Sequence, residues 1–94
     1  MSFETTTEST SGAPPITFTF EGDTFRAELA GAKLYGENEG RGISWMRMTD
    51  ADGVRLADIT AHPRAHRTMS ENVIDIGSAL LWSHWRYLTT KAVT

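Results

Sequence analysis

The sequence predicts an α+β fold in which an antiparallel sheet of about four strands, built from two hairpins, packs against one long C-terminal helix. Three observations indicate this fold. Apolar and polar residues alternate in two short segments on either side of Gly22. A capping box at Thr68 begins a long segment without a strong helix breaker. The chain has 94 residues, which is enough for one domain.

Residues 1–15 are rich in Thr, Ser and Glu and end in two prolines. After Phe3 they offer almost no apolar side chain to bury. Because such a segment cannot offset the entropy lost on ordering, we expect a disordered N-terminal tail over residues 1–15. A single α+β domain is predicted over residues 16–94.

The first hairpin is predicted from two alternating segments, residues 16–20 and 25–29. The dipeptide Gly22-Asp23 between them is typical of a tight turn. The apolar face of this hairpin would consist of Ile16, Phe18, Phe20, Phe25, Ala27 and Leu29. Residues 30–35 leave two alternatives open, a continuation of the second strand past a glycine bulge or a short turn.

The second hairpin follows a predicted glycine-rich loop over residues 36–42. Residues 43–48 form its first strand, which is apolar on both sides and is therefore expected to be central or covered on its second face. Residues 50–53 form a turn with Gly53 in the left-handed conformation. The last strand covers residues 54–60, and a change of phase after Leu56 indicates a bulge or an early end.

The helix is predicted from Met69 to about Thr90 after a connecting loop over residues 61–67. At 100° per residue, its apolar face comprises Val73, Gly77, Leu80, Leu81, His84 and Leu88. Gly77 lies near the centre of this face, where glycine lowers helix propensity. We therefore expect the helix to approach the sheet closely at Gly77, over Trp45 or Phe18.

On the opposite side of the predicted helix, Trp82 lies beside two charged residues. Trp and Arg are enriched at binding hot spots, so an exposed Trp here would be a contact for a partner. The predicted partner-binding residues are Trp82, Arg86 and Asp75, with Arg64 and Arg67 in the preceding loop. The width of the apolar face leaves a monomer and a homodimer, formed through the helix or a sheet edge, as open alternatives.

No residue pattern predicts catalysis, a cofactor or a metal site. The chain has no cysteine, which excludes disulfide scaffolds, Cys-ligated zinc and a thiol nucleophile. His62 and His66 have helical metal-pair spacing, but Pro63 places them in a loop. The Asp50–Gly53 turn begins like a calcium loop, yet position 61 is alanine where the closing glutamate is required. We therefore expect a protein that is not an enzyme.

Charge and targeting features restrict the partner and the compartment. The formal net charge is −3, with an acidic first half and a weakly basic middle, so nucleic acid is a less favoured partner. No segment is long and apolar enough to span a membrane, and no signal peptide is predicted. We expect a cytoplasmic location, in the producing cell or in a host.

Strands carrying Trp45, Arg47 and Arg55, followed by a helix, resemble in outline the arm-binding domains of phage integrases and AP2-type domains. The resemblance covers residues 43–90 and implies nucleic-acid binding by the sheet. It departs from those basic domains because the same strands and turn carry Asp50, Asp52 and Asp58. Residues 19–25 are similar to the first hairpin of some small phage proteins.

The function predicted from the sequence is a small non-catalytic protein-binding module. The setting we expect is a phage- or mobile-element-encoded modulator of a host protein. Two alternatives stay open, a nucleic-acid-binding module and a structural or assembly component of a virion.

Overall fold

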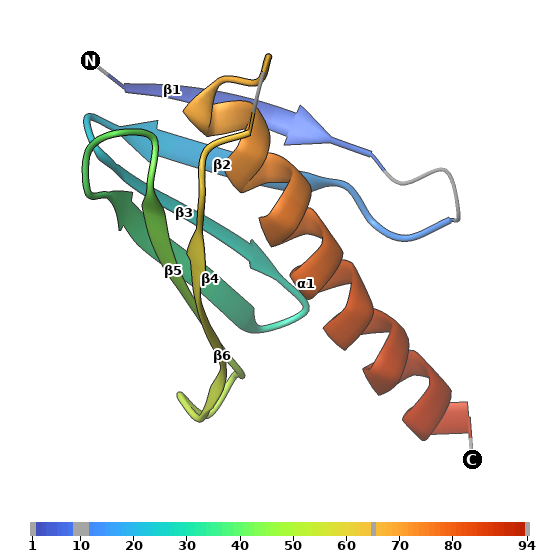
Figure 1. The fold of residues 1–94 in the computed structure, drawn as a ribbon. Coiled ribbons are helices and arrows are strands. Elements are labelled where there is room, and N and C mark those ends of the chain that lie inside the picture. Colours follow the sequence, from blue (N-terminus) through green and yellow to red (C-terminus); the bar gives the residue numbers. More distant parts are fainter. Residues whose placement is uncertain (1, 9–11, 65, 94) are drawn as a thin grey trace.

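The computed structural model describes residues 2–8, 12–64 and 66–93, and it has an α+β fold with one helix packed on one face of an antiparallel sheet (Figure 1). This confirms the predicted fold class, but the sheet has six strands rather than four. The strands run in sequence order as a meander. The elements are β1 Ser2–Thr7, β2 Ile16–Glu21, β3 Thr24–Leu29, β4 Ala32–Asn38, β5 Ser44–Thr49, β6 Arg55–Ala61 and α1 Met69–Val93.

Strand β1 lies inside the segment predicted to be a disordered tail, and for residues 2–7 that prediction is corrected. β1 pairs antiparallel with β2 along its whole length, with Phe3 opposite Phe20. The two rings stack with their centroids 4.8 Å apart. This Thr-rich segment has little apolar surface to bury apart from Phe3. Its order comes from backbone pairing with β2. Residues 1 and 9–11 of the predicted tail lie outside the described residues.

Strands β3 and β4 form a second tight hairpin, which decides between the alternatives left open for residues 30–35. Ala30 and Gly31 form the turn, with φ angles of 51° and 86°. Two successive left-handed residues match the twist of the flanking strands in a two-residue hairpin turn. β4 is therefore a separate strand. It extends to Asn38, so the predicted loop over residues 36–42 is shorter than expected.

Strand β5 is central, as its two-sided apolar pattern predicts, and it pairs with β4 and β6. The Asp50–Gly53 turn is confirmed by the bond from the Gly53 amide to the Asp50 carbonyl, 3.0 Å. The β5–β6 register shifts by one residue between Met48 and Thr49. Leu56 is the extra residue in β6, which confirms the bulge expected from the change of phase.

Helix α1 begins with the predicted capping box. The Thr68 hydroxyl accepts from the Glu71 amide at 3.1 Å, and the Glu71 carboxylate accepts from the Thr68 amide at 3.0 Å. The helix continues to Val93, slightly beyond the predicted end. Within the part of the chain that the structure describes, no helix is long and apolar enough to cross a membrane.

The core lies between α1 and the inner face of the sheet, and Gly77 is the point of closest approach. A methyl group at Gly77 would lie 2.8 Å from Leu34 Cδ2 and 2.9 Å from Phe18 Cε2. The close approach predicted for Gly77 is confirmed, over Phe18 rather than Trp45. The remaining large buried side chains include Ile16, Phe20, Phe25, Leu29, Met46, Met48, Val73 and Leu81.

Trp82 does not point away from the core, so its predicted orientation is wrong. The indole is partly buried and packs against the core, and its Nε1 donates to the Pro14 carbonyl at 2.9 Å. The buried side of the helix is rotated toward Trp82 and includes Ser78, which is 4% exposed. Because Ser is polar and Trp is amphipathic, counting apolar residues around the helix did not predict that this side is buried.

Candidate functional site

Helix α1 covers one face of the sheet, and the opposite face, here called the outer face, carries polar and aromatic side chains. Along β2 to β5, every second residue points to it, while the others enter the core. In β6 the bulge at Leu56 interrupts this alternation. The members of the outer face include Thr17, Thr19, Glu21, Thr24, Arg26, Glu28, Lys33, Tyr35, Glu37, Trp45, Arg47, Arg55, Asp58 and Thr60. This face gathers aromatic and charged side chains of the types found at binding surfaces.

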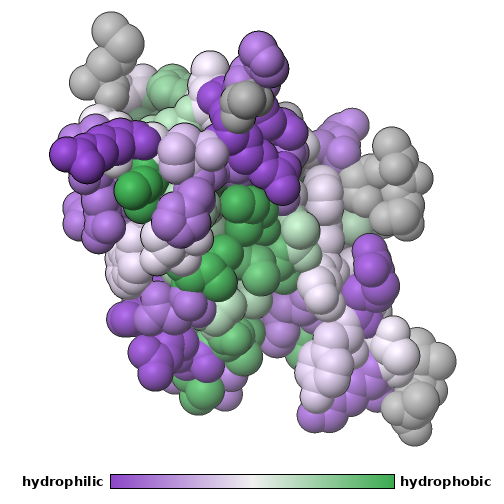
Figure 2. All heavy atoms as spheres, viewed as in Figure 1, coloured by the Kyte–Doolittle hydropathy of each residue, from purple (hydrophilic) through white to green (hydrophobic). Residues whose placement is uncertain are grey.

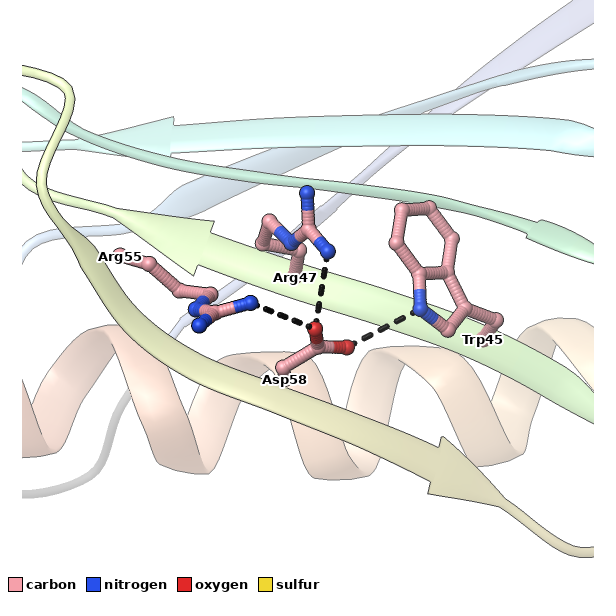
Figure 3. Close-up of polar contacts among 4 residues, drawn as sticks. All are labelled: Trp45, Arg47, Arg55 and Asp58. Carbon is pink, nitrogen blue, oxygen red and sulfur yellow. Dashed lines mark hydrogen bonds and ion pairs between the residues drawn. The ribbon is translucent and has the colours of Figure 1, made fainter.

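A connected group of five side chains lies at the β5–β6 end of the outer face, and we call it the Asp58 cluster. Its members are Tyr35, Trp45, Arg47, Arg55 and Asp58. The Asp58 carboxylate is its centre (Figure 3). One carboxylate oxygen accepts from Trp45 Nε1 at 3.0 Å. The other accepts from Arg47 at 2.9 Å and from Arg55 at 3.4 Å.

Aromatic contacts complete the cluster. The Arg47 guanidinium lies over the Trp45 ring, 5.1 Å from its centroid. The Tyr35 and Trp45 rings meet edge to face with centroids 6.1 Å apart. Both arrangements are favourable for rings and cations that keep partial exposure. Hydrogen bonds and ring contacts therefore link the five side chains of the cluster to one another.

The ionisation of the cluster is fixed by its own hydrogen bonds. The bond from Arg47 lowers the pKa of Asp58, and partial desolvation opposes this only in part. The same bond raises the pKa of Arg47, with a further contribution from Tyr35. Asp58 is therefore a charged acceptor at neutral pH and has no proton to donate. This arrangement is suited to orienting side chains rather than to acid–base chemistry.

The bulge at Leu56 explains how the sequence assembles this cluster. In the regular register that begins at Thr49 and Arg55, residue 58 would face Met46 on the buried side of the sheet. The extra residue shifts the pairing by one and brings Asp58 opposite Arg47 on the outer face. A one-residue slip reverses which face each side chain occupies, so the bulge is what makes the site.

Two shallow grooves flank Tyr35 and Arg26 on the outer face. One has a volume of about 480 Å³ and also includes Thr17, Thr19 and Lys33 in its lining. The other has a volume of about 430 Å³ and extends past Glu37 to Trp45. Each is large enough to accept side chains from another protein.

The charges of the outer face are balanced. It carries basic and acidic side chains in equal number on β2 to β6, among them Arg26, Lys33, Glu28 and Glu37. Arg26 pairs with Glu21 at 3.0 Å. Arg47 and Arg55 share the single carboxylate of Asp58. The face therefore has no net basic surface of the kind that binds phosphates.

The residues predicted to bind a partner occupy a different part of the molecule. Arg67 and Asp75 form an ion pair with each other at 2.6 Å, Trp82 packs inward, and Arg64 and Arg86 are exposed. The structure therefore brings together Arg67 and Asp75 but does not unite all five as one surface. Their role as partner contacts stays a prediction.

The sequence pointed to Trp45, Arg47 and Arg55 through a resemblance, but it did not identify Tyr35 or link Asp58 to them. The signal was present in the Trp45-x-Arg47 spacing, which places both side chains on one face of a strand. A regular hairpin without the bulge would pair Arg47 with Ala57. The sequence indicated a bulge or an early end but not its position, so it did not predict that Asp58 lies opposite Arg47. Tyr35 was not identified because residues 30–35 were left without an assigned structure, and they belong in part to β4.

Among the residues that the structure describes, no group of three or more His, Asp and Glu side chains could hold a metal ion. His62 and His66 are exposed in the loop before the helix, and His84 is half-buried beside Tyr87. Comparisons with protein-family models, curated proteins and solved structures found no match to this chain.

Proposed function

We propose that the protein is a non-catalytic protein-binding module that holds its partner on the outer face of the sheet. The observation that carries the proposal is the Asp58 cluster, in which one carboxylate fixes an indole and two guanidinium groups on an exposed face. Trp, Tyr and Arg are the residue types most often found at binding hot spots. The cluster contains all three.

The partner that fits this face is a folded protein surface of mixed charge. An apolar or aromatic side chain of the partner would enter the groove between Tyr35 and Trp45, and its polar groups would meet Arg26 and Lys33. Because the cluster is already ordered, binding would lose little side-chain entropy. A preorganised surface of this kind can bind a partner without a large buried interface.

A protein partner is favoured over nucleic acid by the charge balance. Phosphate binding requires basic side chains that are not neutralised by neighbouring carboxylates, and here Asp58 is shared by two arginines. The aromatic residues alone could stack on bases, so nucleic acid is kept as a test outcome. Origin in a phage or mobile element stays a prediction from the sequence.

The proposal is tested by site-specific photo-crosslinking in cells that express the full chain. A photoreactive phenylalanine derivative replaces Glu37, which is exposed beside Tyr35 and Trp45. The matched control carries it at Ala79, which is exposed on the helix. We expect a discrete protein adduct from position 37 that is absent from position 79. Adducts with nucleic acid, equal adducts at both positions, or no adduct at position 37 would overturn the proposal.

A further inference from the structure

Strand β6 is an edge of the sheet, and no described residue pairs with its outer side. A free strand edge presents unpaired N–H and C=O groups and can pair with another strand. The regular part of this edge is short. The bulge at Leu56 limits it on one side, and Pro63 follows soon after the strand on the other. Residues 57–61 are therefore the segment able to extend the sheet.

An apolar band lies directly beside this edge. Ile59 of β6, and Ile76 and Leu80 of α1, are partly buried and remain accessible at their margins. Ile76 and Leu80 share a helix flank with Asn72, whose side chain donates to the His62 carbonyl just after β6. This flank therefore faces β6. Figure 2 shows the band as continuous apolar surface between β6 and the helix.

From this edge and band we infer that the protein forms a two-fold symmetric dimer in which β6 pairs antiparallel with β6 of a second copy. The two sheets would join into one, and the helix flanks would extend the contact across the two-fold axis. A second copy of the chain is the expected partner because this strand can pair with itself. A two-fold interface must be self-complementary, and the central band carries no charged side chain.

Charge selects the register. A register centred on Asp58 would place two carboxylates directly opposite each other, which is unfavourable. A register centred on Ile59 uses all of residues 57–61 and places Ile59 opposite its copy. In that register Asp58 of each copy lies across from Thr60 of the other, and a hydroxyl can donate to a carboxylate. Both the length of the regular segment and the charges therefore favour the register centred on Ile59.

The area that such a dimer must bury is a modest share of the molecular surface. A specific interface of modest size buries about 600 Å² on each partner, roughly a tenth of the 5954 Å² accessible surface. The strand edge and the helix flank lie side by side and bury together in this arrangement. The dimer does not depend on the proposed binding function, because the outer face stays open in both copies.

The dimer is tested by sedimentation equilibrium of the full chain over a range of concentrations. Thr60→Asp creates two opposed carboxylate pairs per dimer, and it should raise the dissociation constant about tenfold. Thr60→Lys creates two attractive pairs and should lower it or leave it unchanged. Thr19→Asp and Thr19→Lys carry the same charges four strands away and should have no effect.

Hydrogen exchange gives a second readout that a folding defect would not reproduce. Protection of those amides of residues 57–61 that point away from β5 should rise with wild-type concentration, while that of β3 stays constant. A chain that is monomeric at about 1 mM would overturn the inference. A dimer whose affinity does not respond to the charge at residue 60 would overturn it as well. Circular dichroism confirms that each variant is folded before its result is used.

Discussion

Replacing Gly77 with alanine tests the closest contact between the helix and the sheet. The new Cβ would lie 2.8 Å from Leu34 Cδ2 and 2.9 Å from Phe18 Cε2, whereas carbon atoms in favourable contact are about 3.5–4.0 Å apart. Both neighbours are fully buried, at 1% and 0% exposure. Neither side chain can move away without disturbing its own packing.

The size of the effect follows from two opposing contributions. Alanine is favoured over glycine in a helix by about 1 kcal/mol. Overpacking a filled core by a methyl group costs about 1–3 kcal/mol. We therefore expect Gly77→Ala to lower the free energy of unfolding by about 1 kcal/mol. For a domain of this size that corresponds to a melting temperature about 4–8 °C lower.

The assay is urea and thermal denaturation of Gly77→Ala beside Ser83→Ala. Residue 83 is exposed on the same helix, so this control gains helix propensity without a clash and should be slightly more stable than wild type. If Gly77→Ala were more stable than wild type by about 1 kcal/mol, as propensity alone requires, the close approach would be refuted.

Four further predictions concern local features of the fold. Ala30→Asn should raise the melting temperature by about 2–8 °C, because Asn tolerates the left-handed turn position better than Ala. Thr68→Ala should cost about 1 kcal/mol in a urea titration, because it removes the helix cap. The pKa of Asp58 is lowered in the folded protein, so its stabilising effect is full above its ordinary value of 3.8 and disappears as the pH falls through the lower folded value. Urea titrations from pH 7 to about pH 2 should therefore show a steeper loss for wild type than for Asp58→Asn. Trp82→Ala should cost about 3 kcal/mol by thermal denaturation, the low end of the range for a core Trp, because the indole is partly buried. Trp82→Phe should cost about 1 kcal/mol, whereas a surface-exposed Trp82 would give almost no change.

Features that depend on nearby residues could be predicted from the sequence. The β2–β3 hairpin, the Asp50–Gly53 turn and the capping box at Thr68 each follow from a few adjacent side chains. The close approach at Gly77 was also predictable, since a glycine at the centre of an apolar helix face is costly without a packing reason.

Features that depend on distant partners could not be predicted. Strand β1 has almost no apolar pattern, and its order comes from pairing with β2. The burial of Trp82 depends on the Pro14 carbonyl, which is remote in sequence. The Asp58 cluster required both the bulge position and the β4 assignment, because a shift of one residue decides which side chains share a face.

The most direct test of the account is the affinity of the crosslinked protein partner for two matched variants. Tyr35→Ala removes an aromatic side chain from the outer face, and Tyr87→Ala removes the same side chain from the exposed helix. Isothermal titration with the purified partner should show affinity at least about tenfold weaker for Tyr35→Ala and unchanged for Tyr87→Ala. Equal affinities for the two variants, or a loss confined to Tyr87→Ala, would contradict the assignment of the outer face as the binding surface.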